Sequence, residues 1–366
     1  MATHPPLTNP LDTVIPHPFS DEELVDSQSE LSSALSDPAT QSELWEETEE
    51  ILRWDNPSPG LKKACMVLRV FQQMLSSHGQ TTLMVDIKLC GRNQRKLRNF
   101  GTYLVNTILK PMKLASNARS ARSTPASPSR GAANAITQMA AIIQPSNRNR
   151  QETLQAECLR RDGFRCAYTL LPDENSARKR LIDVPAGATV METNLSHILP
   201  LALRTFDGAV QREKDAVAMV WHGLYRYFPQ IKNKIDSGSL NQHENLITFA
   251  TTTHARFDNH RLAFEPVTNQ PNKYRIRILD IYPPSFQPPP GHRDLMILRS
   301  SDNNFPLPDP DYFRVHYTIA KILDVSGIGE EIEAEISASR LDPENLNPDG
   351  STDLGAILCR KMLMNI

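Results

Sequence analysis

Three polar residues that lie inside apolar segments most constrain how this chain can fold: His197, Asn245 and His254. Their apolar neighbours are Leu195, Ile198, Leu199, Leu246, Ile247, Phe249 and Phe257. This spacing predicts a strand, a loop and a short helix that pack together. A polar side chain that is buried among apolar residues needs hydrogen-bond partners there, or else has a role in binding or catalysis.

The same three residues match, in this order, the needs of a one-metal phosphodiesterase. His197 can accept a proton from water, Asn245 can fix a loop and orient His197 through hydrogen bonds, and His254 can hold a cation. Asp258 follows His254 by four residues, so both project from one helix face. A carboxylate favours Mg²⁺ or Mn²⁺ and an imidazole also accepts Zn²⁺. Two simpler interpretations stay open, because a lone histidine is more often a core residue and Asp258 can form a local ion pair.

Four short segments carry a family resemblance: Arg165-Cys166-Ala167-Tyr168-Thr169, Ser196-His197-Ile198-Leu199-Pro200, Glu244-Asn245-Leu246-Ile247 and His254-Ala255-Arg256-Phe257-Asp258. Together they resemble a fungal member of the HNH endonuclease superfamily, which has the ββα-metal fold, over residues 152–266. The resemblance implies metal-dependent hydrolysis of nucleic-acid phosphodiesters, with DNA as the expected substrate. It implies His197 as the general base, Asn245 as the residue that positions its loop, and His254 and Asp258 as ligands of one divalent ion.

One position departs from many members of this superfamily. They carry an acidic metal ligand just before the first histidine, where this chain has Ser196. A hydroxyl is a much poorer ligand than a carboxylate. Either Asp258 supplies the missing charge, or metal binding is weak, or the domain is inactive. The alternative function is therefore an HNH-fold protein that binds nucleic acid or another partner without cleaving.

Further candidate residues lie before this region. Arg160, Arg161 and Arg165 are expected to contact phosphates, although a solvated helix face explains them equally well. Cys166 has no second cysteine at zinc-ligand spacing, so it is expected to be buried rather than metal-bound.

Charge is distributed unevenly along the 366 residues. Residues 1–60 hold 13 acidic side chains and one basic side chain, whereas residues 87–150 hold 12 basic side chains and no acidic one. An acid-free basic segment fits a polyanion such as nucleic acid. It equally fits a linker whose charges pair with the acidic N-terminal segment.

These observations together predict an α+β protein. Its HNH-like core carries a helical insertion at 210–235, and the core is preceded by helices and followed by strands and helices. Within the chain we expect helices at 41–54, 61–77 and 93–111, and strands at 164–171, 180–184 and 189–198. The expected divisions are a disordered acidic tail (1–40), a helical module (41–114), a flexible basic linker (115–150), a nuclease-like domain (151–270), C-terminal strands and a helix (271–340) and an uncertain tail (341–366).

The cellular compartment is inferred from what the sequence lacks. There is no basic-then-apolar signal segment and no apolar run of membrane-spanning length. The five cysteines, Cys65, Cys90, Cys158, Cys166 and Cys359, are scattered and include no C-x-x-C pair. We therefore expect an intracellular protein with reduced thiols, cytoplasmic or nuclear.

Overall fold

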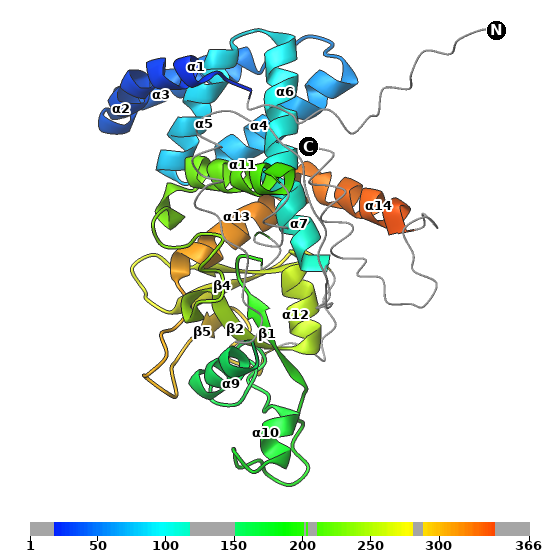
Figure 1. Ribbon diagram of the computed structural model, residues 1–366. Coiled ribbons are helices and arrows are strands. Elements are labelled where there is room, and N and C mark those ends of the chain that lie inside the picture. The colour runs from blue at the N-terminus through cyan, green and yellow to red at the C-terminus, as the bar shows by residue number, and fades with distance from the viewer. Residues whose placement is uncertain (1–17, 118–150, 201–202, 204–210, 281–287, 341–366) are drawn as a thin grey trace, which may run out of the picture.

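The computed structural model describes residues 18–117, 151–200, 203, 211–280 and 288–340. These form a mixed α+β structure in which helices at one end meet two small sheets at the other (Figure 1). The expected linker 115–150 and the tail 341–366 lie almost wholly outside the described residues, so the domain boundaries stay predictions.

The N-terminal part is entirely helical. Its elements are α1 (Asp21–Asp26), α2 (Gln28–Ser36), α3 (Pro38–Ile51), α4 (Pro59–Met74), α5 (Ser77–Cys90), α6 (Gln94–Leu104), a π-helical turn (Val105–Leu109) and α7 (Lys110–Asn117). The three predicted helices are confirmed as α3, α4 and the run from α6 to α7. Helix α5 is not among the predicted helices; it contains Gly79, a residue type that is more common at the end of a helix than inside one.

The prediction of a disordered tail over 1–40 is wrong for residues 21–40, which are helical. Helix α1 begins with a capping box in which Ser20 and Glu23 satisfy each other's backbone N–H groups. Glu23 also lies 2.7 Å from the Lys96 ammonium, and Glu30 lies 2.7 Å from that of Lys88. Composition alone could not show that this acidic segment finds basic partners some 60 to 70 residues away. Pairing with the N-terminal acids is thus confirmed for these two lysines.

Helix α5 joins the helical part to the inserted helix α11 (Gln211–Tyr227). Asp86 of α5 is fully buried and accepts hydrogen bonds from the Arg226 Nε at 2.8 Å and the Tyr227 hydroxyl at 2.7 Å. Gly79 packs so closely that a Cβ there would lie 2.0 Å from the Tyr227 carbonyl oxygen. That contact explains why the glycine lies inside the helix rather than at its end.

The C-terminal part contains the two sheets. Its remaining elements are α9 (Gln151–Arg161), α10 (Glu174–Arg178), β1 (Thr193–His197), β2 (Leu246–Ala250), α12 (Thr251–Asp258), β3 (Leu262–Pro266), β4 (Lys273–Ile278), β5 (Leu295–Ile297), α13 (Pro310–Ser326) and α14 (Ile328–Arg340). Strands β1 and β2 form one antiparallel sheet, and β3, β4 and β5 form the other, also antiparallel.

Two predicted strands are wrong. Residues 164–171 form a turn, since Phe164 and Leu170 have φ values of 56° and 61°, a left-handed conformation that interrupts a strand. Residues 180–184 follow the short helix α10 and form no strand, with Arg180 at φ 56°. The strand predicted over 189–198 is confirmed, in shorter form, as β1.

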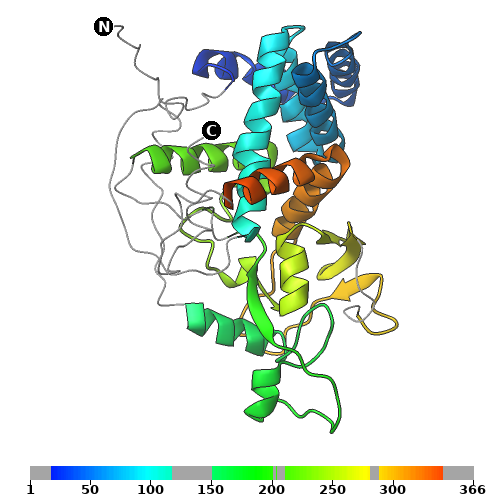
Figure 2. The ribbon, with the colours of Figure 1, turned by 90° about the vertical axis from the view of Figure 1, so that its right-hand side faces the viewer.

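Helix α13 connects the two ends of the molecule, because it contacts both β3 and α4. Its buried Phe313 meets Phe257 of α12 and Phe264 of β3, with ring centroids 6.2 and 5.9 Å apart. Helix α7 runs down from the helical part to reach α12 (Figure 2). Helix α12 is thus packed against α7 from the N-terminal helical part and against α13 from the C-terminal part.

Candidate active site

The candidate site is built on β1, β2 and α12. The antiparallel register places Ser196 opposite Ile247 and His197 opposite Leu246. Helix α12 begins at Thr251, directly after β2 ends, so its side chains lie beside the end of β1. Ser196 near the end of β1 and Asp258 on α12 are therefore brought together although they lie 62 positions apart in the chain.

Asp258 lies between the strand and the helix. One of its carboxylate oxygens is 3.0 Å from His254 Nε2, and the other accepts a weak hydrogen bond from the Ser196 hydroxyl at 3.4 Å. The His254 and Asp258 side chains are about a quarter exposed, at 26% and 24%, so solvent and small ligands can reach them. The i, i+4 spacing predicted from the sequence thus does place both side chains together.

His197 is partly buried at the end of β1, and its contact is to a different segment. Its Nε2 lies 2.8 Å from the Oδ1 of Asn241. Its chain neighbour Ser196 contacts Asp258, and successive side chains of a strand point to opposite faces, so His197 reaches Asn241 on the other face. Asn241 was missed by the sequence interpretation, since nothing in the run Leu240-Asn241-Gln242-His243 marks it out.

Asn245 is fully buried and makes three side-chain hydrogen bonds. Its Oδ1 accepts from the Leu199 N–H at 2.8 Å, and its Nδ2 donates to the carbonyls of Leu199 at 2.9 Å and Leu240 at 3.0 Å. Its own carbonyl accepts from the Ile198 N–H at 2.9 Å. These bonds hold the loop that follows His197.

Arg161 is not available to a phosphate, and its expected role in nucleic-acid contact is wrong. The side chain is completely buried and donates to the carbonyls of Leu246 at 2.7 Å and His243 at 2.9 Å. It also pairs with Asp162 at 2.8 Å, whose other oxygen accepts from the Thr248 N–H. Burial lowers the pKa of Arg161, but the opposing charges nearby, chiefly Asp162, make the net shift upward. This pair anchors strand β2.

The other two arginines differ in the exposure of their side chains and in their contacts. Arg160 is about half exposed, pairs with Asp302 and lies over the ring of Phe305 at 5.6 Å. Arg165 is partly buried and donates to the Gly163 carbonyl at 3.2 Å. Cys166 is buried, as expected.

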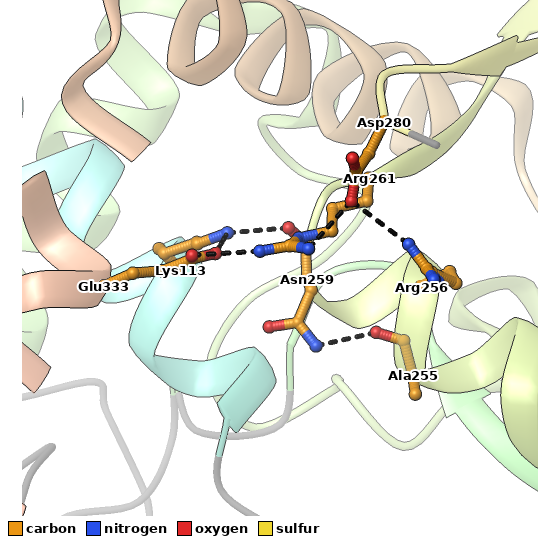
Figure 3. A network of polar contacts seen from close by, with 7 residues as sticks. All are labelled: Lys113, Ala255, Arg256, Asn259, Arg261, Asp280 and Glu333. Carbon is orange, nitrogen blue, oxygen red and sulfur yellow. Dashed lines mark hydrogen bonds and ion pairs between the residues drawn. The ribbon is translucent and has the colours of Figure 1, made fainter. Parts of the chain in front are cut away.

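Ionic contacts hold the C-terminal end of α12 (Figure 3). The Lys113 ammonium of α7 donates to the Asn259 carbonyl at 2.7 Å and pairs with Glu333 of α14 at 2.6 Å. Arg261 joins Glu333 at 3.0 Å to Asp280 at 2.8 Å. Burial lowers the pKa of Lys113, while Glu333 opposes that shift.

A stack of rings supports the same helix from its buried side. Phe257 lies 3.8 Å, centroid to centroid, from His316 of α13, and the His316 ring lies 4.6 Å from that of His260. The Phe257 carbonyl lies 3.1 Å from His316 Nε2. Burial lowers the pKa of His316 to about 3, so this ring is neutral in the folded protein. The helix that carries His254 and Asp258 is therefore rigidly supported.

Comparison with known families adds one finding to this geometry. Residues 168–265 match a family model described as HNH endonuclease. The matched segment contains His197, Asn245, His254 and Asp258, so this part of the chain is similar to HNH endonucleases. It begins after Arg160, Arg161 and Arg165. No curated protein and no solved structure matches the chain.

The HNH segment offers few strong metal donors. Across the described parts of the chain, no group of three or more His, Cys, Asp or Glu side chains is arranged to hold a metal ion. The candidate site has one carboxylate, Asp258, in contact with one imidazole, His254, and with the Ser196 hydroxyl. This donor set suits an ion such as Mg²⁺, which keeps several waters and binds through one or two carboxylates together with substrate phosphates. No helix among the described residues is long and apolar enough to cross a membrane.

Proposed function

We propose that this chain is an intracellular, metal-dependent endonuclease that hydrolyses phosphodiester bonds of nucleic acid, with DNA as the expected substrate. In this proposal β1, β2 and α12 form the ββα-metal core. The observation that carries it is the position of Asp258, within 3.0 Å of His254 and 3.4 Å of Ser196. One carboxylate thereby joins α12 to the strand that bears His197.

His197 is the general base of the proposed reaction. An imidazole titrates near neutral pH, so at physiological pH it can accept a proton from water. The water oxygen forms a bond to phosphorus as its proton passes to His197. The bond from phosphorus to the leaving sugar oxygen breaks, and that oxygen takes a proton from solvent. Asn245 acts by holding the loop after His197 and does not touch the substrate.

His254 and Asp258 are the proposed ligands of one divalent cation, with Mg²⁺ or Mn²⁺ favoured and Zn²⁺ compatible. When bound, the cation neutralises charge on a phosphate oxygen and on the leaving oxygen. Asp258 then supplies the negative charge that Ser196 lacks. Because both side chains come from one rigid helix, little reorganisation is needed to bind the cation.

The test is cleavage of plasmid DNA by the full chain with Mg²⁺ or Mn²⁺, with an RNA substrate assayed in parallel. Wild-type protein is expected to nick and linearise the plasmid, and His197→Ala is expected to abolish this. His78→Ala serves as the matched control, since His78 is exposed on α5 in the helical part. Cleavage by His197→Ala at the wild-type rate would contradict the assignment of the base.

A second candidate function follows from Ser196. With a hydroxyl where an acidic ligand is common, the HNH fold could bind nucleic acid without cleaving it. That function predicts DNA retention that weakens steeply with added salt, and no cleavage by wild type or variant. Loss of all DNA retention at low salt would exclude this second function.

A further inference from the structure

The residue in contact with His197 comes from the segment inserted between β1 and β2. Asn241 lies 44 positions after His197, beyond helix α11, and its Oδ1 is 2.8 Å from the His197 Nε2. The insertion therefore brings a side chain to the proposed base, in addition to docking the helical part.

Asn241 is anchored on both sides by its chain neighbours. The Leu240 carbonyl before it accepts a hydrogen bond from Asn245 at 3.0 Å. The Gln242 side chain after it donates to the Tyr312 hydroxyl of α13 at 2.7 Å. Because both neighbours are fixed, the Asn241 amide has little freedom to leave the His197 ring.

The same buried amide also fixes the loop that follows His197. Asn245 binds the N–H and carbonyl of Leu199, two residues after His197, as well as the Leu240 carbonyl, one residue before Asn241. One side chain thus holds together the two loops that carry the ring and its partner. The distance between His197 and Asn241 is set by this shared attachment.

The chemistry of the contact determines which ring nitrogen can act as the base. An amide oxygen accepts hydrogen bonds and donates none, so the neutral ring must carry its proton on the nitrogen that faces Oδ1. That nitrogen is Nε2, and the lone pair then resides on Nδ1. We propose that Asn241 is a positioning residue that holds His197 in its Nε2–H form and so presents Nδ1 to the attacking water. This inference rests on the proposed nuclease function.

The experiment compares two substitutions of Asn241 in the full chain. Asn241→Leu keeps the approximate shape and removes the acceptor, whereas Asn241→Asp keeps an acceptor at the same place. For Asn241→Leu we expect kcat to fall about tenfold with KM unchanged, the loss that one orienting hydrogen bond produces. Asn241→Asp is expected to restore most of that activity at a pH above the raised His197 titration midpoint. Asn175→Leu, on the exposed face of α10, makes the same chemical change as a control.

A second readout does not depend on cleavage. Histidine ring signals are followed by NMR during a pH titration, with the His197 signal assigned from its absence in His197→Gln. A carboxylate beside the ring is expected to move the His197 titration midpoint upward by about one pH unit or more in Asn241→Asp. An unmoved midpoint overturns the proposal, as does a neutral wild-type ring protonated on Nδ1 or full kcat in Asn241→Leu. If wild-type protein cleaves nothing, the NMR readout still decides the contact, so failure of the nuclease function is distinguishable.

Discussion

Replacing Asn245 by leucine is expected to destabilise the protein strongly, although the two side chains have similar shape. Leucine cannot bond the Leu199 N–H, the Leu199 carbonyl or the Leu240 carbonyl, which the native amide satisfies at 2.8, 2.9 and 3.0 Å. Each lost hydrogen bond costs about 1 kcal/mol net, and more when a buried group is left unpaired. We expect the free energy of unfolding to fall by about 3 to 4 kcal/mol, a large part of the stability typical of a domain.

The assay is urea-induced unfolding of the full chain followed by circular dichroism and tryptophan fluorescence. The midpoint of the transition is expected to shift to lower urea for Asn245→Leu. Asn175→Leu is the control, since Asn175 is exposed on α10 and its substitution is expected to change stability by at most about 0.5 kcal/mol. A loss below about 1 kcal/mol for Asn245→Leu would refute the argument that this amide holds the two loops together.

Three further stability predictions use the same assay. Asp86→Ala leaves the buried Arg226 guanidinium without its partner and is expected to lower the free energy of unfolding by about 3 to 5 kcal/mol. The double variant Asp86→Leu, Arg226→Met is expected to recover much of that loss. Equal losses for the single and the double variant would contradict this prediction. Gly79→Ala places a Cβ 2.0 Å from the Tyr227 carbonyl oxygen and is expected to cost more than about 1 kcal/mol, so an unchanged midpoint would show that α5 and α11 pack differently. Burial lowers the pKa of His316 to about 3, whereas the unfolded value is near 6.5. The stability that depends on a neutral His316 ring is therefore fully present above pH 6.5 and is lost as pH falls toward 3. Between pH 7 and pH 5 the wild type is expected to lose about 2 kcal/mol more than His316→Leu, and parallel pH profiles would disprove the buried neutral state.

Local patterns in the sequence were sufficient for most of the helices and for part of the site. Asp309 directly precedes Pro310 in the sequence, a pattern typical of a helix start, and its Oδ1 accepts the Asp311 N–H at 2.8 Å at the start of α13. The contact between His254 and Asp258 follows from helical spacing alone. These features depend on residues within a few positions of one another, which a sequence displays directly.

Contacts between distant segments account for what the sequence could not show. Arg161 lies in a sequence typical of a solvated helix end. Its hydrogen-bond acceptors are carbonyls more than 80 positions away in the chain, and the segments that carry them bury the Arg161 side chain. Asn241 is one polar residue among several, and only the folded insertion brings it to His197. Helix α1 depends on Lys96, which pairs with Glu23 from 73 positions further along the chain. In each case the partner residue is too far away in the sequence for a local pattern to indicate it.

The most direct test of the proposed metal centre is an anomalous-scattering map from crystals of the full chain soaked in Mn²⁺. We expect one peak bound by His254 Nε2 and a carboxylate oxygen of Asp258, at about 2.1 to 2.2 Å from each, with its remaining positions open to water. The same soak of His254→Ala crystals is expected to lose that peak. Crystals of the wild type with no peak beside these two side chains, or with the ion held elsewhere, would contradict the account.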